Sequence, residues 1–172
     1  MEQIKAAYSA GSYDKFNRLA SELPQKSVFR PYVEIWQFRF FQKGIEKQFP
    51  DQEVVWAKSD IMPLLNRHEN SWPAETLRRD WLEQLARTAQ WTDFAEQRQR
   101  LRYRPDQGVE CADLMYAAEQ GQLVRYKLNS VISFDKRLPK TCRVLLKNLY
   151  KVGGITAQDL DRHVLQLVAG NQ

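Results

Sequence analysis

The sequence is poor in residues that interrupt regular secondary structure. Its 172 residues contain seven glycines, seven prolines, two cysteines and two histidines. Low glycine and proline contents favour long regular segments, and no alternating apolar–polar run has the length of a strand. Apolar residues make up 43% of the chain, which suffices for a core. These observations predict an all-α protein.

Long hydrophobic runs are also missing. No apolar stretch approaches the length of a signal-peptide core or a membrane-spanning helix. Residues 1–5 lead straight into an amphipathic helical pattern. Taken alone, this indicates a cytosolic protein with no membrane span.

Recognisable catalytic and cofactor motifs are absent as well. The sequence has no glycine-rich phosphate loop and no nucleophile elbow. Neither His68 nor His163 has a cysteine or carboxylate at metal-ligand spacing, and Asp159 lies four residues before His163, as in ordinary helix-surface pairs. We expect no metal and no cofactor.

What the chain does have is a near-regular series of breaks. They fall at Gln90-Trp91, Gly121-Gln122 and Gly153-Gly154, 31 and 32 residues apart, and each separates two helix-patterned stretches. This period is typical of stacked helical hairpins. The prediction is a superhelix of antiparallel helical hairpins, an α-solenoid of the tetratricopeptide type, in a single domain over 1–172.

Apolar residues at helical spacing precede each break. They are Leu77, Trp81, Leu85 and Ala89 before the first break, Cys111, Leu114, Met115 and Ala118 before the second, and Leu145, Leu146, Leu149 and Val152 before the third. Ser71, followed by Trp72-Pro73, provides a helix start signal. Pro31 and Pro73 suit helix starts.

Other elements are predicted at the two ends. Residues 10–13 form a hairpin turn, and longer helices follow around 31–46 and 51–68. Pro63 should kink or divide the helix that holds Trp56 and Leu64. Residues 156–159 match a capping box, and a last helix carries the apolar stripe Leu160, Val164, Leu167 and Val168.

The two cysteines lie one repeat apart. Cys111 and Cys142 are near the starts of two predicted helices, so stacked hairpins could bring them together, with roughly 3–4 kcal/mol of stabilisation if they pair. Spacing alone favours two buried free thiols, since free cysteine packs as a small hydrophobe.

Four arginines alternate near residue 100. Arg98, Arg100, Arg102 and Arg104 could form an anion-binding strip for carboxylates or phosphates, in a chain of net charge +5. The alternative is a solvated helix end and loop, because alternate residues of a helix point in different directions.

The tryptophans allow two interpretations. Trp36, Trp72, Trp81 and Trp91 occur within helix-packing patterns or at turns, which favours a packing role. A sugar-stacking platform would need one of them to be exposed.

Three segments, taken in order, resemble a known family. Residues 29–37, FRPYVEIWQ, look like a family segment YPLYPYLEYWQL. Residues 72–91 resemble a signature P-A-x-x-L-R-x-x-(W/F)-L-x-x-L-A-x-x-x-x-W, and residues 111–121 resemble C-x-x-x-Y-A-x-x-x-x-G. The pattern, which runs from about residue 3 to 170, resembles the N-terminal helical region of soluble lytic transglycosylases, periplasmic enzymes that cut peptidoglycan glycan strands.

The resemblance carries several implications. Cys142 falls where the family places a second cysteine, so a Cys111–Cys142 disulfide and a periplasmic location are implied, with a native signal peptide replaced by Met1. The implied fold is a right-handed superhelix that forms part of a ring around access to a lysozyme-like catalytic domain. Residues 169–172 look like a hairpin turn without its second helix, which predicts a piece of a longer array.

The family's catalytic motifs do not occur in this sequence. There is no Glu-Ser pair, no Gly-Leu-Met-Gln and no Ala-Tyr-Asn-x-Gly, so no catalytic residue is transferred. The resulting hypothesis is a non-catalytic module that restricts the access of peptidoglycan to a catalytic domain. The expected partners are the catalytic domain of the parent enzyme and peptidoglycan, which the module would contact weakly or indirectly. Two alternatives stay open. The first is a free-standing helical-repeat adaptor that binds a protein or peptide. The second is a basic solenoid that binds nucleic acid, although nucleic acid is not the partner we expect.

Overall fold

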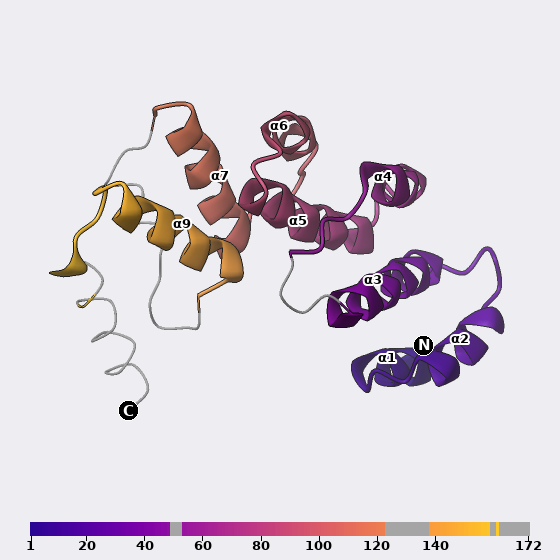
Figure 1. Ribbon diagram of the computed structural model, residues 1–172. Helices are drawn as coiled ribbons and strands as arrows, with labels where there is room; N and C mark the ends of the chain where they lie inside the picture. The colour runs from indigo at the N-terminus through magenta and orange to yellow at the C-terminus, as the bar shows by residue number, and fades with distance from the viewer. Residues whose placement is uncertain (49–52, 123–137, 159–160, 162–172) are drawn as a thin grey trace. The chain divides into compact units, whose positions relative to one another are not determined.

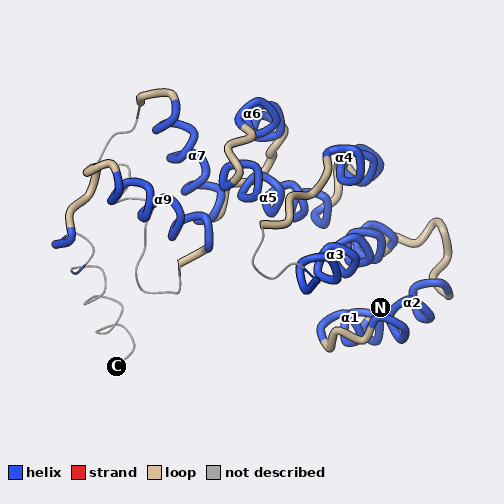
Figure 2. Tube along the Cα trace, in the orientation of Figure 1, coloured by secondary structure: helices blue, strands red, loops and turns tan. Residues whose placement is uncertain are grey.

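The described part of the chain is helical throughout. The computed structural model describes residues 1–48, 53–122, 138–158 and 161, and within these ranges it contains helices and loops but no strand (Figures 1 and 2). The all-α prediction is therefore confirmed. The chain divides into two compact units, unit 1 (Met1–Arg78) and unit 2 (Arg79–Gln172). The predictions of one domain over 1–172 and of a continuous superhelix stay predictions.

Unit 1 begins with a helical hairpin, α1 (Glu2–Ser9) and α2 (Tyr13–Ser21). Gly11 turns the chain with φ +70°, a left-handed conformation that glycine adopts without strain, and the Ser12 amide donates to the Ala7 carbonyl at 3.0 Å. The predicted turn at residues 10–13 is confirmed.

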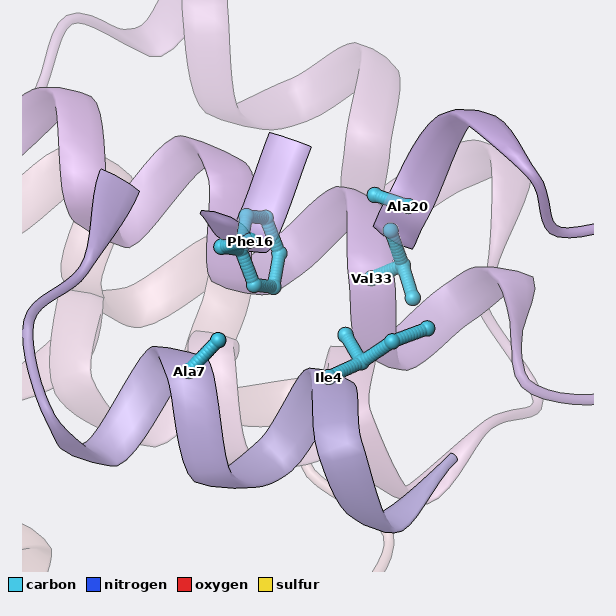
Figure 3. Close-up of a cluster of buried hydrophobic side chains, with 5 residues drawn as sticks. All are labelled: Ile4, Ala7, Phe16, Ala20 and Val33. Atoms are coloured by element: carbon cyan, nitrogen blue, oxygen red, sulfur yellow. The ribbon is translucent and has the colours of Figure 1, made fainter. Parts of the chain in front are cut away.

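The hairpin packs on α3 (Arg30–Gln48) through a small core. Figure 3 shows this cluster, whose side chains come from α1, α2 and α3; its members are Ile4, Ala7, Phe16, Ala20 and Val33. Pro31 is the second residue of α3, where a missing amide hydrogen costs nothing, so both the helix around 31–46 and its proline start are confirmed.

The second long helix of unit 1 differs from the prediction. Residues 53–57 are not helical, and α4 spans Lys58–Arg67, so Trp56 lies outside it and a helix over 51–68 was wrong. The physical reason is tertiary packing, because the ring of Trp56 stands edge-on to that of Phe38 on α3 at 5.3 Å. Pro63 lies inside α4 without dividing it. It leaves the carbonyl of Ser59 without a helical donor, which solvent can replace because Ser59 is exposed.

Helix α5 (Trp72–Arg87) crosses the boundary between the units. The Ser71 hydroxyl accepts a hydrogen bond from the Ala74 amide at 3.3 Å, which confirms the predicted start. Leu77, Trp81 and Leu85 are buried. The expected fourth member of this stripe, Ala89, lies beyond the helix end at φ +55°, so extending the stripe to it was wrong.

Unit 2 continues with α6 (Trp91–Gln99), α7 (Gln107–Glu119) and α9 (Lys140–Lys151). All three predicted breaks fall between or after helices. Gly121 and Gly153 have φ +68° and +72° and end α7 and α9. Val152 was predicted on the buried face of α9, but it follows the last helical residue and is 78% exposed.

Some predictions concern residues outside the described part of the chain. They are Asp159 of the capping box, the stripe Leu160, Val164, Leu167 and Val168, the second histidine His163, and residues 169–172.

Candidate functional site

The most definite feature of unit 2 is covalent. Cys111 of α7 and Cys142 of α9 form a disulfide, with Cα atoms 5.1 Å apart and both side chains fully buried. The bridge that the family resemblance implied is confirmed, and the spacing argument for two free thiols was wrong. Spacing cannot show that α7 and α9 pack directly on each other, and it is this packing that brings the two cysteines together. The bond is compatible with an oxidising compartment.

A partly buried polar cluster lies beside the disulfide and joins α5, α7 and α9. We call Glu83, Arg87, Gly108 and Thr141 the Glu83 cluster. Arg87 Nη1 donates to Thr141 Oγ1 at 2.7 Å, Thr141 Oγ1 donates to Glu83 Oε2 at 2.5 Å, and Arg87 Nη1 lies 3.6 Å from Glu83 Oε2. A Cβ on Gly108 would collide with the Glu83 carboxylate. Glycine at 108 therefore lets the backbone of α7 pass directly over a charged group of α5.

Burial determines the electrostatics of this cluster. Desolvation raises the pKa of Glu83, and the nearby Asp106 and Asp80 add to the rise, while the bond from Thr141 and the charge of Arg87 oppose it. A carboxyl group with a raised pKa can act as a general acid. Here the carboxylate accepts a hydrogen bond from Thr141 of α9 and lies against Gly108 of α7, while Arg87 belongs to its own helix, so the geometry assigns it to holding α5 against α7 and α9. Sequence reasoning missed this cluster; the one available signal was a glycine in the first turn of a predicted helix.

The four arginines of the predicted strip are spread over a helix end and a loop. Arg98, in α6, pairs with Asp113 of α7 through two nitrogens, at 2.8 Å from Nε and 2.9 Å from Nη2. These hydrogen bonds raise the pKa of Arg98, against some desolvation. Arg100 pairs with Glu96 at 3.4 Å, and Arg102 and Arg104 follow in the loop after α6. Arg98 and Arg100 thus already have carboxylate partners.

Unit 1 contains a second charged cluster, between α3 and the end of α4. Glu34 Oε2 lies 2.9 Å from both Arg67 Nη1 and His68 Nε2. Burial opposes ionisation of Glu34, but its hydrogen bonds to His68 and Arg67 outweigh that effect and lower its pKa. The fold supplies His68 with a carboxylate from 34 residues away, which spacing along the sequence could not reveal. The cluster borders an open hollow of about 510 Å³ that Lys26 and Arg30 also line.

A larger cleft in unit 1 is lined by aromatic rings and lysines. It has a volume of about 620 Å³ and lies between the α1–α2 turn and the last turns of α3. We call it the aromatic cleft and define it by Tyr8, Tyr13, Phe40, Phe41, Lys43 and Lys47. Tyr13 is 51% exposed and Phe41 60% exposed. Large rings that are half open to solvent at the rim of a concave site are typical of ligand-binding surfaces.

The tryptophans mostly have packing roles. Trp81 is fully buried. The ring of Trp36 stacks on that of Tyr8 with centroids 4.9 Å apart, and the ring centroids of Trp91 and Tyr116 are 5.8 Å apart. Trp72, at the start of α5, is 48% exposed, so it alone of the four discussed meets the condition for a sugar-stacking ring.

Comparison with known proteins gives no match: no protein-family model, no curated protein and no solved structure matches this chain. Within the described residues, no helix has the length and apolar character needed to cross a membrane. In the same ranges, no group of three or more histidine, cysteine or acidic side chains is placed to hold a metal ion.

Proposed function

We propose that this chain is a non-catalytic helical module of a periplasmic soluble lytic transglycosylase, which shapes and restricts the access of peptidoglycan to a catalytic domain. The Cys111–Cys142 disulfide is the observation that carries the proposal. It joins the two cysteines that occupy the family's positions, and a buried bridge of this kind is characteristic of proteins that mature outside the reducing cytosol.

The order of the helices supports the same proposal. Hairpin breaks occur at the expected intervals, and α7 packs on α9 as neighbouring hairpins of a superhelix would. The segments that resemble the family form α3, α5 and α7. The finer features, a right-handed superhelix and a place in a ring around the catalytic domain, belong to the proposal.

Product analysis on isolated sacculi tests this function. Three reactions are compared: the protein alone, a lytic transglycosylase catalytic domain alone, and that domain with the protein in molar excess. The protein alone should release no 1,6-anhydromuramyl product. In the mixture, the lengths of the released glycans should change, because the module limits which strands reach the catalytic acid.

Two results would contradict the proposal. Anhydromuramyl product from the protein alone would show that it is itself catalytic. A mixture whose products match those of the catalytic domain alone, at every excess of protein, would remove the role in restricting access. An unrelated helical protein of similar net charge serves as the control for nonspecific coating of sacculi.

A further inference from the structure

The aromatic cleft combines three properties that select a ligand. Its rings are held rigidly, since Phe40 packs edge-on to Tyr8 at 4.9 Å and to Phe16 at 5.2 Å, and Phe16 belongs to the fully buried core (Figure 3). Tyr8 and Phe40 are therefore anchored from behind, and a ligand need not order them on binding.

The second property is the exposed ring surface. Tyr13 contacts Phe40 edge-on at 5.7 Å but leaves half of its own surface in solvent, and Phe41 is more open still. Both rings offer a flat apolar face, and the Tyr13 hydroxyl adds a polar group at the ring edge, which suits a ligand with an apolar face of its own, such as a pyranose ring.

The third property is charge. Among the described residues that line the cleft, the charged ones are Lys43 and Lys47, and none is acidic. Lys43 is exposed, and its Nζ lies 5.5 Å from the centre of the Tyr8 ring, which places the ammonium group beside an aromatic ring of the cleft. The cleft is thus complementary to a ligand that carries negative charge next to an apolar face.

We propose that the aromatic cleft binds a muropeptide, an N-acetylated disaccharide that bears a carboxylate-rich stem peptide. The inference rests on the proposed function, which it deepens by naming the ligand class and its binding site. The sugar stacks on Tyr13 and Phe41, and the stem-peptide carboxylates meet Lys43 and Lys47. This region of α3 thereby becomes a contact point for the glycan strand.

Gly44 provides a variant that can block the cleft without damaging the fold. It lies within α3 and lines the cleft, and a Cβ added there meets nothing within 4 Å. Gly44→Glu should therefore fold normally while placing a bulky carboxylate among the lysines. Gly44→Ala is the matched control, since it changes the same backbone position but adds one methyl group and no charge.

The experiment is a titration of the full chain with the disaccharide-tetrapeptide that a muramidase releases from sacculi. Calorimetry gives the Kd, and the amide NMR signals of Gly11 and Gly44 report on the cleft, with Gly108 in unit 2 as the reference that should not move. We expect Gly44→Glu to raise the Kd at least about tenfold, the equivalent of one charge-assisted contact. Gly44→Ala should stay within about twofold of the original protein, a change too small to mean a lost contact.

Lys43→Met tests the charge separately. It keeps most of the side chain's length and should raise the Kd about threefold, with a weaker dependence of binding on salt. Three further probes test the ligand class: the neutral N-acetylglucosamine disaccharide, the free stem peptide and a single-stranded oligonucleotide. Each should bind more weakly than the muropeptide.

Several results would overturn the assignment. They are no binding of the muropeptide, an unchanged Kd for Gly44→Glu, shifts confined to unit 2, or a free peptide or oligonucleotide that binds as tightly as the muropeptide. The two proposals fail separately. A cleft that does not bind while the sacculi mixture still changes its products removes this inference alone, and a cleft that binds while the products stay unchanged removes only the role in restricting access.

Discussion

The partly buried carboxyl group of Glu83 should make the stability of this protein depend on pH in an unusual direction. Because burial raises its folded-state pKa above the ordinary value of 4.5, the folded protein binds more protons than the unfolded one between these two values. The free energy of unfolding therefore falls as pH rises through that window, and the contribution is fully present only below about pH 4.5.

Substituting Glu83→Gln should remove this dependence. Relative to the original protein, the variant should gain stability as pH rises from 4.5 to 7.5, whatever its absolute stability. Urea unfolding at several pH values measures the difference. A constant difference across that range would show that the folded-state pKa of Glu83 is not raised.

Glu34 should behave in the opposite way. Its bonds to His68 and Arg67 outweigh burial and lower its folded-state pKa, so its contribution is present above about pH 4.5 and is lost as pH falls through the folded-state pKa. Glu34→Gln should cost up to about 1 kcal/mol at pH 7, the range of partly exposed ion pairs. That cost should shrink as the pH is lowered below about 4.5, which urea unfolding at more acidic pH measures. A cost that stays constant or grows there would contradict the assignment.

Two glycines inside helices should respond oppositely to alanine. At Gly44 nothing lies within 4 Å of the added Cβ, so Gly44→Ala should stabilise the protein by roughly 0.5–1 kcal/mol. At Gly108 the Cβ displaces the Glu83 carboxylate from Thr141, and Gly108→Ala should cost about 1–2 kcal/mol, the loss of a partly buried hydrogen bond to a charged group.

A double-mutant cycle separates this collision from other effects. In a Glu83→Ala background the carboxylate is gone, so Gly108→Ala should no longer be destabilising. An equal cost in both backgrounds would mean that Gly108 is required for a reason other than the passage of α7 over Glu83. Thermal or urea unfolding of the four proteins gives the cycle.

At the scale of elements, the disulfide is the main constraint on α7 and α9. It closes a loop of 31 residues, for which chain entropy predicts roughly 3–4 kcal/mol of stabilisation. Cys111→Ala combined with Cys142→Ala should lower the free energy of unfolding by about that amount, as should reduction of the original protein. Reductant should not affect the double variant, and equal stability of reduced and oxidised protein would contradict the prediction.

The helices themselves could mostly be predicted from the sequence, because their signals are local. Gly121, Gly153 and Ser71 act within one helical turn of their own positions, and each ends or starts a helix as expected. The non-helical segment 53–57 could not be predicted, since the contact of Trp56 with Phe38 decides it over a long sequence separation.

The candidate sites depended even more on long-range contacts. Thr141 reaches Glu83 across 58 residues, and His68 reaches Glu34 across 34. No periodicity or spacing encodes such pairs. The arginine pattern at 98–104 illustrates the reverse case, because it was visible in the sequence, yet Arg98 and Arg100 are paired with acids once the chain folds.

For the protein as a whole, the stability of unit 2 and the proposed periplasmic location both depend on the Cys111–Cys142 disulfide. Cys111 and Cys142 are fully buried within the helical core of unit 2, and the periplasmic assignment requires that they are oxidised in the cell. A cytosolic adaptor would keep both thiols reduced. The state of these two sulfur atoms in the native host therefore distinguishes the two classes of function.

The most direct measurement is the intact mass of the native protein after acid quenching of its own cells, denaturation and alkylation, with and without prior reduction. The proposed function predicts that no alkyl group is added before reduction and that two are added afterwards. Two alkyl groups added without reduction would contradict both the bridge and the periplasmic module.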